Sequence, residues 1–287
     1  MKKKLVVALI SAAMVTSMLG ACGSSNASSS SASNTATSSV SASSASEEDT
    51  TAASSSVSAS SASEEVSADA DQEAADKVAA LIDAIYVQER NDNTDEQCKE
   101  AKEAWDALTD AQKELVEGEN ADPDYFGRDT GDASKDDPLN GDEIGENELL
   151  VVSFGTSFND SRAEDIGGVE KALQAAYPDW SVRRAFTAQI IINHVQARDD
   201  EKIDNVDQAL ERAVSNGVKK LIIQPTHLMH GAEYDELKEA VDSYKDKFES
   251  VTIAEPLLGE VGSDATVINE DKQAVAEAIT AQAVKSA

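Results

Sequence analysis

The feature that most constrains the fold is an alternation, between residues 148 and 287, of short apolar runs with amphipathic helical stretches. The apolar runs are ELLVVSFG, WSVRRAF, VKKLIIQP and SVTIAEP. Helical spacing of apolar residues covers about 161–177, 188–197, 205–215, 234–248 and 270–284. Strands that alternate with helices of this length require crossover connections and pair in parallel. We therefore predict an α/β lobe over 148–287, a four-stranded parallel sheet with flanking helices.

The residues just before this lobe predict a small helical module over 71–117. Val78, Leu81, Ile82 and Ile85 share one helical face. Capping-box patterns that begin at threonines 94 and 109 open two further helices, and the first of these carries a cysteine and a tryptophan, residues 98 and 105, at core positions. Residues 118–147 are acidic and rich in Gly, Pro and Asp, which indicates a solvated linker rather than a calcium loop.

The N-terminus predicts export and lipid anchoring. Residues 1–22 combine a basic start, a short apolar segment and Leu19-Gly20-Ala21-Cys22, which resembles a bacterial lipobox. Lipidation of Cys22 would anchor the chain outside the cytoplasmic membrane, and an ordinary secretory signal is the alternative. Residues 23–70 are Ser, Ala and Thr with scattered Glu, so we expect a disordered tether.

Charge excludes some classes of partner. The chain has 24 basic and 55 acidic residues, a formal net charge of −31. Such a chain has no basic patch for phosphates, so we expect no nucleic-acid partner and membrane contact through the lipid anchor alone.

Ligands of open parallel sheets bind at the carboxyl ends of the strands, where two loops attract attention. The first holds Ser153, Phe154, Gly155, Thr156 and Ser157, whose hydroxyls and amides could bind a ligand, although a plain turn with a helix cap explains them equally well.

The second loop holds His227, His230 and Glu233, spaced three apart. Imidazole and carboxylate groups suit divalent cobalt, nickel, iron and zinc, so this loop predicts a metal site. A structural cap is the alternative. The chain's one other histidine, His194, lies in a predicted helix, where a structural role is expected.

Five motifs in order then resemble one family. They are LLVVSFGTSFNDSR, RRAFTAQIII, RDDEKIDNVDQAL, QPTHLMHGAEYDEL and EPLLG. Together they resemble the anaerobic sirohydrochlorin cobaltochelatases, which are class II tetrapyrrole chelatases. The resemblance implies a lyase-type activity that inserts Co²⁺ into sirohydrochlorin during cobalamin biosynthesis, with no organic cofactor. It implies that Glu233 reaches the metal, that the 153–157 loop lies against the macrocycle, and that His227 ligates haem in exported members.

The chain departs from the family pattern in one respect. The glycine-flanked histidine and the later histidine of the family's second lobe do not occur in this sequence. We therefore expect a first lobe only, with weak activity by itself, and a homo-oligomer is a further expectation because single-lobe relatives pair. The alternatives are a cell-surface haem- or metal-binding module without catalysis, and a structural protein.

Overall fold

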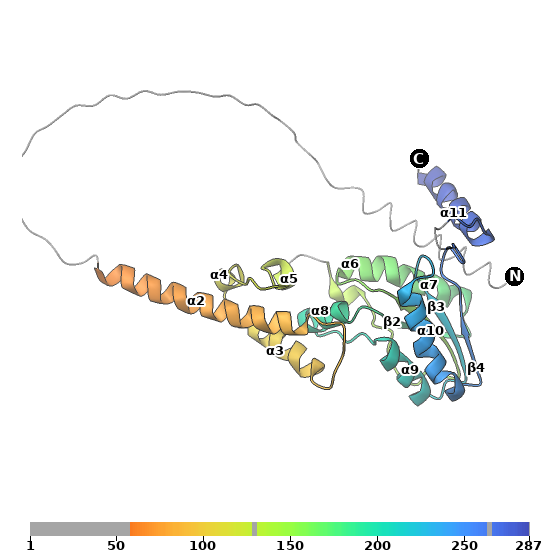
Figure 1. Cartoon of the computed structure of the whole chain (residues 1–287), viewed down its shortest axis with the longest axis horizontal. Helices are drawn as coiled ribbons and strands as arrows, with labels where there is room; N and C mark the ends of the chain where they lie inside the picture. Colours follow the sequence, from red (N-terminus) through yellow and green to blue (C-terminus); the bar gives the residue numbers. More distant parts are fainter. Residues whose placement is uncertain (1–57, 128–130, 263–265, 287) are drawn as a thin grey trace, which may run out of the picture.

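The computed structural model describes residues 58–127, 131–262 and 266–286 (Figure 1). The predicted signal peptide and Cys22 lie outside these residues. Among the described residues, none of the helices is both long and apolar enough to cross a membrane.

The predicted four-stranded parallel sheet is confirmed. Its strands are β1 (Asn147–Ser153), β2 (Ser181–Phe186), β3 (Lys220–Pro225) and β4 (Ser250–Ile253). All neighbours pair in parallel in the order β2-β1-β3-β4, so β1 and β3 are central. Six of the seven residues of β1 are buried, as expected for a strand covered on both faces.

Helices follow each strand, close to the predicted positions. The helices of the lobe are α6 (Asn159–Ser161), α7 (Gly167–Ala176), α8 (Gln189–Asp199), α9 (Val206–Ser215), α10 (Ala232–Tyr244) and α11 (Glu270–Ser286). The helix predicted over 161–177 is interrupted, because a π-helical turn at Arg162–Ile166 separates α6 from α7. A short 3-10 turn, Lys245–Lys247, ends α10.

Alternate residues of β1 point into two different cores. Leu150 and Val152 pack in a cluster that includes residues of α9 and α10. Leu149 and Val151 pack in a second cluster, which includes residues of α7 and Val275 of α11. The lobe therefore has three layers, with helices on both faces of the sheet (Figure 1).

The helical module consists of α2 (Ser58–Ile85), α3 (Thr94–Asp106), α4 (Asp110–Lys113) and α5 (Asp124–Gly127). Helix α2 begins inside the stretch 23–70 that the sequence assigns to a tether, and it projects away from the sheet (Figure 1). The predicted apolar face of α2 is buried, and Cys98 and Trp105 are core residues, 0% and 6% exposed.

One of the two predicted capping boxes is confirmed. Thr109 accepts from the backbone N–H of Gln112, whose side chain bonds back to the Thr109 N–H. The box predicted at Thr94 is wrong, because α3 begins at Thr94 itself with Asn93 as its N-cap. The Thr94 hydroxyl instead accepts the backbone N–H of Asn91, which ends the preceding turn.

The module docks on α8 of the lobe through buried polar contacts. Asn193 Nδ2 donates to the Ile85 carbonyl at 2.9 Å, and Gln196 Nε2 donates to Asp95 Oδ1 at 2.8 Å. Ala197 of α8 is fully buried within the apolar core of the module. One buried and one part-buried hydrogen bond, together with a shared core, therefore hold the two parts in one arrangement.

Part of the acidic segment 118–147 is packed rather than solvated. The Asp136 side chain is 2% exposed and accepts from Arg184 Nη1 at 2.6 Å and Arg162 Nε at 2.7 Å. Glu170 of α7 binds the same Arg184 guanidinium through both carboxylate oxygens, at 2.7 Å each. Burial pushes the pKa of Asp136 upward, but the two arginines outweigh burial and leave it lowered. This buried network fastens the segment to β2 and to the π-helical turn.

Candidate functional site at the carboxyl edge of the sheet

The loops that follow β1, β2 and β3 meet at the carboxyl edge of the sheet. The Thr187 and Ala188 amides donate to the carbonyls of Ser153 and Phe154, at 2.9 and 3.2 Å. The Thr226 amide donates to the Val152 carbonyl at 2.9 Å. Backbone bonds therefore hold the three loops side by side, where ligands of parallel α/β sheets bind.

Two hydroxyls of the first loop, those of Ser153 and Thr156, form hydrogen bonds within the protein. Ser153 is buried, and its Oγ accepts from Thr226 Oγ1 at 3.0 Å. Thr156 Oγ1 accepts the Phe158 amide at 3.2 Å, and the Ser157 carbonyl accepts from Arg198 at 2.7 Å. These contacts shape the loop, and ligand binding by the 153–157 loop stays a prediction.

Gly155 allows this loop to turn close to the sheet. Its φ is +102°, a conformation that favours glycine. A Cβ atom there would lie 2.6 Å from the ring of Phe186, which is fully buried at the end of β2. The turn leaves the neighbouring Phe154 ring 50% exposed.

Exposed apolar side chains gather on two of these loops. Phe154 and Phe158 follow β1, and Leu228 and Met229 follow β3. They are 50%, 43%, 52% and 38% exposed. Large apolar side chains left in water beside a sheet edge indicate a surface for a flat or apolar ligand.

His227 is paired with Glu233. His227 Nε2 lies 3.6 Å from Glu233 Oε2, and the His227 side chain is only 8% exposed. Within the described part of the chain, neither of its ring nitrogens forms a hydrogen bond. Burial lowers the pKa of His227, which Glu233 only partly opposes, so the ring is neutral near pH 7. A neutral imidazole beside a carboxylate is a competent ligand pair for a divalent metal ion.

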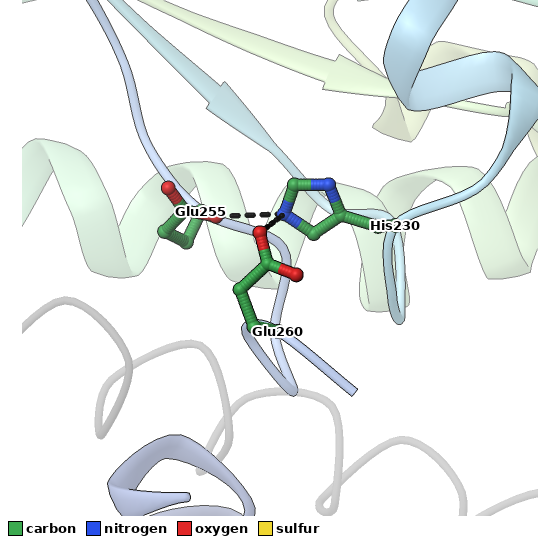
Figure 2. Close-up of side chains that lie close together, drawn as sticks. All are labelled: His230, Glu255 and Glu260. Carbon is green, nitrogen blue, oxygen red and sulfur yellow. Dashed lines mark hydrogen bonds and ion pairs between the residues drawn. The ribbon is translucent and has the colours of Figure 1, made fainter. Parts of the chain in front are cut away.

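His230 has different partners. Its Nε2 lies 2.8 Å from Glu255 Oε2 and 3.5 Å from Glu260 Oε1, both in the segment after β4 (Figure 2). The predicted trio is thus divided between the His227–Glu233 pair and a group of three that contains His230. In the described ranges, the group whose ligand atoms all lie within 4.8 Å of one another is His230, Glu255 and Glu260.

A cavity of about 410 Å³ lies beside Glu233. Its lining includes Phe186 and Thr187 at the end of β2, together with Glu236 one turn along α10. The loop after α2 contributes the stretch 88–90, so the helical module forms part of the wall. Nothing in the spacing of the sequence predicts this contribution, because it depends on how the module docks.

Sequence reasoning missed Glu255 and Glu260 as members of the site. A signal for Glu255 was present, because it follows the β4 run directly and so lies at the carboxyl edge. His194, read as structural, stacks edge-on against Phe126 of the module with ring centroids 5.7 Å apart.

The residues present do not fit haem ligation at His227. A haem iron needs the macrocycle face against a ring nitrogen, and this side chain is 8% exposed with Glu233 beside it. A small hydrated ion has no such requirement.

Comparisons with known proteins agree on one family for the lobe. Residues 147–287 match the family model described as cobalt chelatase (CbiK). Over 110 residues the chain is 38% identical to a sirohydrochlorin cobaltochelatase of Salmonella typhimurium, covering 38% of this chain and 42% of that protein. Over 116 residues it is 28% identical to sirohydrochlorin cobaltochelatase CbiKC of Nitratidesulfovibrio vulgaris, covering 40% of each chain. The chain thus spans about two fifths of the length of these curated relatives. By sequence, the α/β lobe of this protein is similar to the cobalt chelatase (CbiK) family.

Proposed function

We propose that this lobe binds sirohydrochlorin at the carboxyl edge of its sheet and brings Co²⁺ to it as the second substrate. The observation that carries the proposal is the His227–Glu233 pair, 3.6 Å apart, in a lobe similar to cobalt chelatases. The names of the two relatives supply the substrate and the metal.

Side chains of this lobe suit two steps of the reaction, binding of the macrocycle and binding of the metal ion. Exposed Phe154 and Leu228 offer an apolar surface to the macrocycle. Glu233, 46% exposed in the first turn of α10, meets the hydrated ion from the cavity side, and His227 lies behind it. Replacement of water by these two ligands would prepare the ion for the ring nitrogens.

Insertion releases two pyrrole protons for each Co²⁺ taken up, so a proton acceptor is also needed. The Glu233 carboxylate would accept one proton as it releases the ion to the ring nitrogens, and solvent at this open edge would accept the other. Positioned general bases commonly contribute about 10²–10⁴-fold to a rate.

The experiment follows the absorbance of sirohydrochlorin mixed with the full chain and Co²⁺. The matched control is Glu239→Gln, which makes the same change on an exposed part of α10 that does not line the cavity. We expect the chain to bind the macrocycle and to accelerate insertion weakly, as expected of one lobe by itself. Glu233→Gln should remove most of that acceleration, and Glu239→Gln should leave the rate within twofold of the parent.

Two results would overturn the proposal: no binding of sirohydrochlorin, or equal rates for the two variants. Binding of Co²⁺ or of the macrocycle with no insertion would instead favour a surface metal- or tetrapyrrole-binding module.

We also propose that the protein is a lipoprotein held outside the bacterial membrane through Cys22. The lipobox pattern of residues 19–22 supports this. Cys22→Ser should abolish incorporation of labelled fatty acid and release the chain from the membrane fraction, whereas Cys98→Ala should do neither. Membrane association that survives Cys22→Ser would contradict the anchor.

A further inference from the structure

A second group of metal-binding side chains lies outside the His227–Glu233 pair. His230 comes from the loop between β3 and α10, and Glu255 and Glu260 come from the segment after β4. Figure 2 shows the imidazole and the two carboxylates converging on one point. Their candidate ligand atoms all lie within 4.8 Å of one another. Small side-chain movements would therefore let one ion reach all three.

Backbone hydrogen bonds hold the two loops together. The Leu257 amide donates to the His227 carbonyl at 3.0 Å, and the Leu258 amide donates to the Leu228 carbonyl at 2.9 Å. The chain then turns at Gly259, whose φ is +59° and whose amide donates to the Pro256 carbonyl. This turn brings the next residue, a glutamate, back towards the imidazole.

Two further contacts fix individual ligands. The His230 ring packs edge-on against Tyr234, with centroids 4.4 Å apart, and Tyr234 is 5% exposed. Asn269 Nδ2 donates to the Glu260 carbonyl at 2.6 Å. Ligands held in place before an ion arrives lose less entropy on binding it.

The charge of the group favours a cation. Two carboxylates approach one imidazole, and among the described residues neither Glu255 nor Glu260 forms an ion pair with a lysine or arginine. By contrast, the buried carboxylates of Asp136, in the acidic segment, and Glu170, in the lobe, have arginine partners. The repulsion between two unpaired carboxylates would be relieved by a divalent ion.

We propose that His230, Glu255 and Glu260 form a site for a divalent transition-metal ion, separate from the His227–Glu233 pair. The imidazole selects ions such as Co²⁺, Ni²⁺ and Zn²⁺ over Ca²⁺ and Mg²⁺, which prefer oxygen ligands alone. The side chains are 28%, 56% and 75% exposed, so water completes the coordination and the ion exchanges freely. This site would exist whether or not the protein acts on a tetrapyrrole.

The test titrates the full chain carrying Glu233→Gln, which removes the carboxylate of the neighbouring pair, with Co²⁺ alone and follows the imidazole proton resonances. This Glu233→Gln chain is the parent of the variants below. The sequence has only three histidines, so the His230 signals can be assigned with a His230→Asn variant. Paramagnetic Co²⁺ at one equivalent should broaden the His230 ring signals, and a tenfold excess of Mg²⁺ or Ca²⁺ should not restore them. Calorimetry on the same samples gives the dissociation constant.

The informative variant is the double substitution Glu255→Gln with Glu260→Gln. Its matched control is Glu239→Gln with Glu249→Gln, which removes the same charge at exposed positions, one of them at the amino end of β4. We expect the first variant to raise the dissociation constant of this site at least tenfold and to abolish the His230 broadening. The control should bind within twofold of the parent.

Three outcomes would overturn the site. The His230 signals could stay unchanged on addition of Co²⁺, the Glu255/Glu260 variant could bind Co²⁺ as tightly as the parent does, or the control variant could lose as much Co²⁺ affinity as the Glu255/Glu260 variant. Recovery of the signals by Mg²⁺ would refute the selectivity. His230→Asn gives a second check, since loss of the imidazole should also weaken Co²⁺ binding at least tenfold.

Discussion

Replacement of Glu148 by glutamine should stabilise the protein at neutral pH. Glu148 lies in β1, with Ser181 of β2 and Leu221 of β3 as its neighbours in register, and is 2% exposed. Burial raises the pKa of Glu148 from 4.5 to about 7, although Arg183 opposes this rise. The carboxyl group is therefore protonated in the folded protein at a pH where it is ionised in the unfolded chain.

The direction of the effect follows from proton binding. Between pH 4.5 and about 7 the folded state holds a proton that the unfolded state has released. The free energy of unfolding therefore falls as pH rises through this window. A rise from 4.5 to about 7 corresponds to roughly 3 kcal/mol, since each pKa unit is worth about 1.4 kcal/mol. Glutamine has a similar shape and no such penalty.

The assay is urea unfolding, followed by circular dichroism, of the parent and the Glu148→Gln variant between pH 5 and pH 8. The free energy of unfolding of the variant should exceed that of the parent by an amount that grows as pH rises, up to about 3 kcal/mol at pH 8. Glu239→Gln, at an exposed position, should show a difference that does not vary with pH. A difference between parent and Glu148→Gln that stays constant within about 0.5 kcal/mol would refute the reasoning, because the buried carboxyl would then titrate as it does in water.

Three further predictions concern the contacts that hold the parts together. Asn193→Ala should lower the free energy of unfolding in urea by about 1–3 kcal/mol, because the buried Ile85 carbonyl loses its hydrogen-bond donor. It should also speed amide hydrogen exchange in the helical module. Asp136→Asn should lower the free energy of unfolding by about 3–5 kcal/mol, because the buried Arg184 loses a charged partner, and an unchanged denaturation midpoint would contradict this. Burial raises the pKa of Cys98 to about 11, so in a Cys22→Ser chain at pH 8 a thiol reagent should react with Cys98 only after unfolding.

The sheet could be predicted from the sequence because its signals are local. Each strand is a short apolar run, and each crossover helix shows its own periodicity, so order and direction follow from general rules of chain connection. The start of α4 was likewise predictable, because its capping box joins Thr109 and Gln112, which are only three positions apart in the sequence. The interruption of the first crossover helix at Arg162 was not predictable, because the π-helical turn accompanies an arginine buried against Asp136, 26 residues earlier.

The loop after β3, which carries His227 and His230, has contacts that sequence spacing alone does not predict. Its spacing predicts one metal site made of His227, His230 and Glu233. In the structure His227 lies beside Glu233, in the helix that follows the loop, and His230 lies beside other carboxylates. The partners of His230 come from the segment after β4, 25 and 30 residues further on, and the pairing of β4 with β3 brings them there.

The sequence by itself therefore determined the kind of sheet, the edge at which the candidate site is expected and the residue types available for chemistry. The tertiary structure decided which of those residues meet. It also decided that the loop after α2, from a different part of the chain, forms a wall of the cavity. The physical reason is that strand and helix signals depend on neighbours within a few residues, whereas ligand geometry depends on packing between segments far apart in the chain.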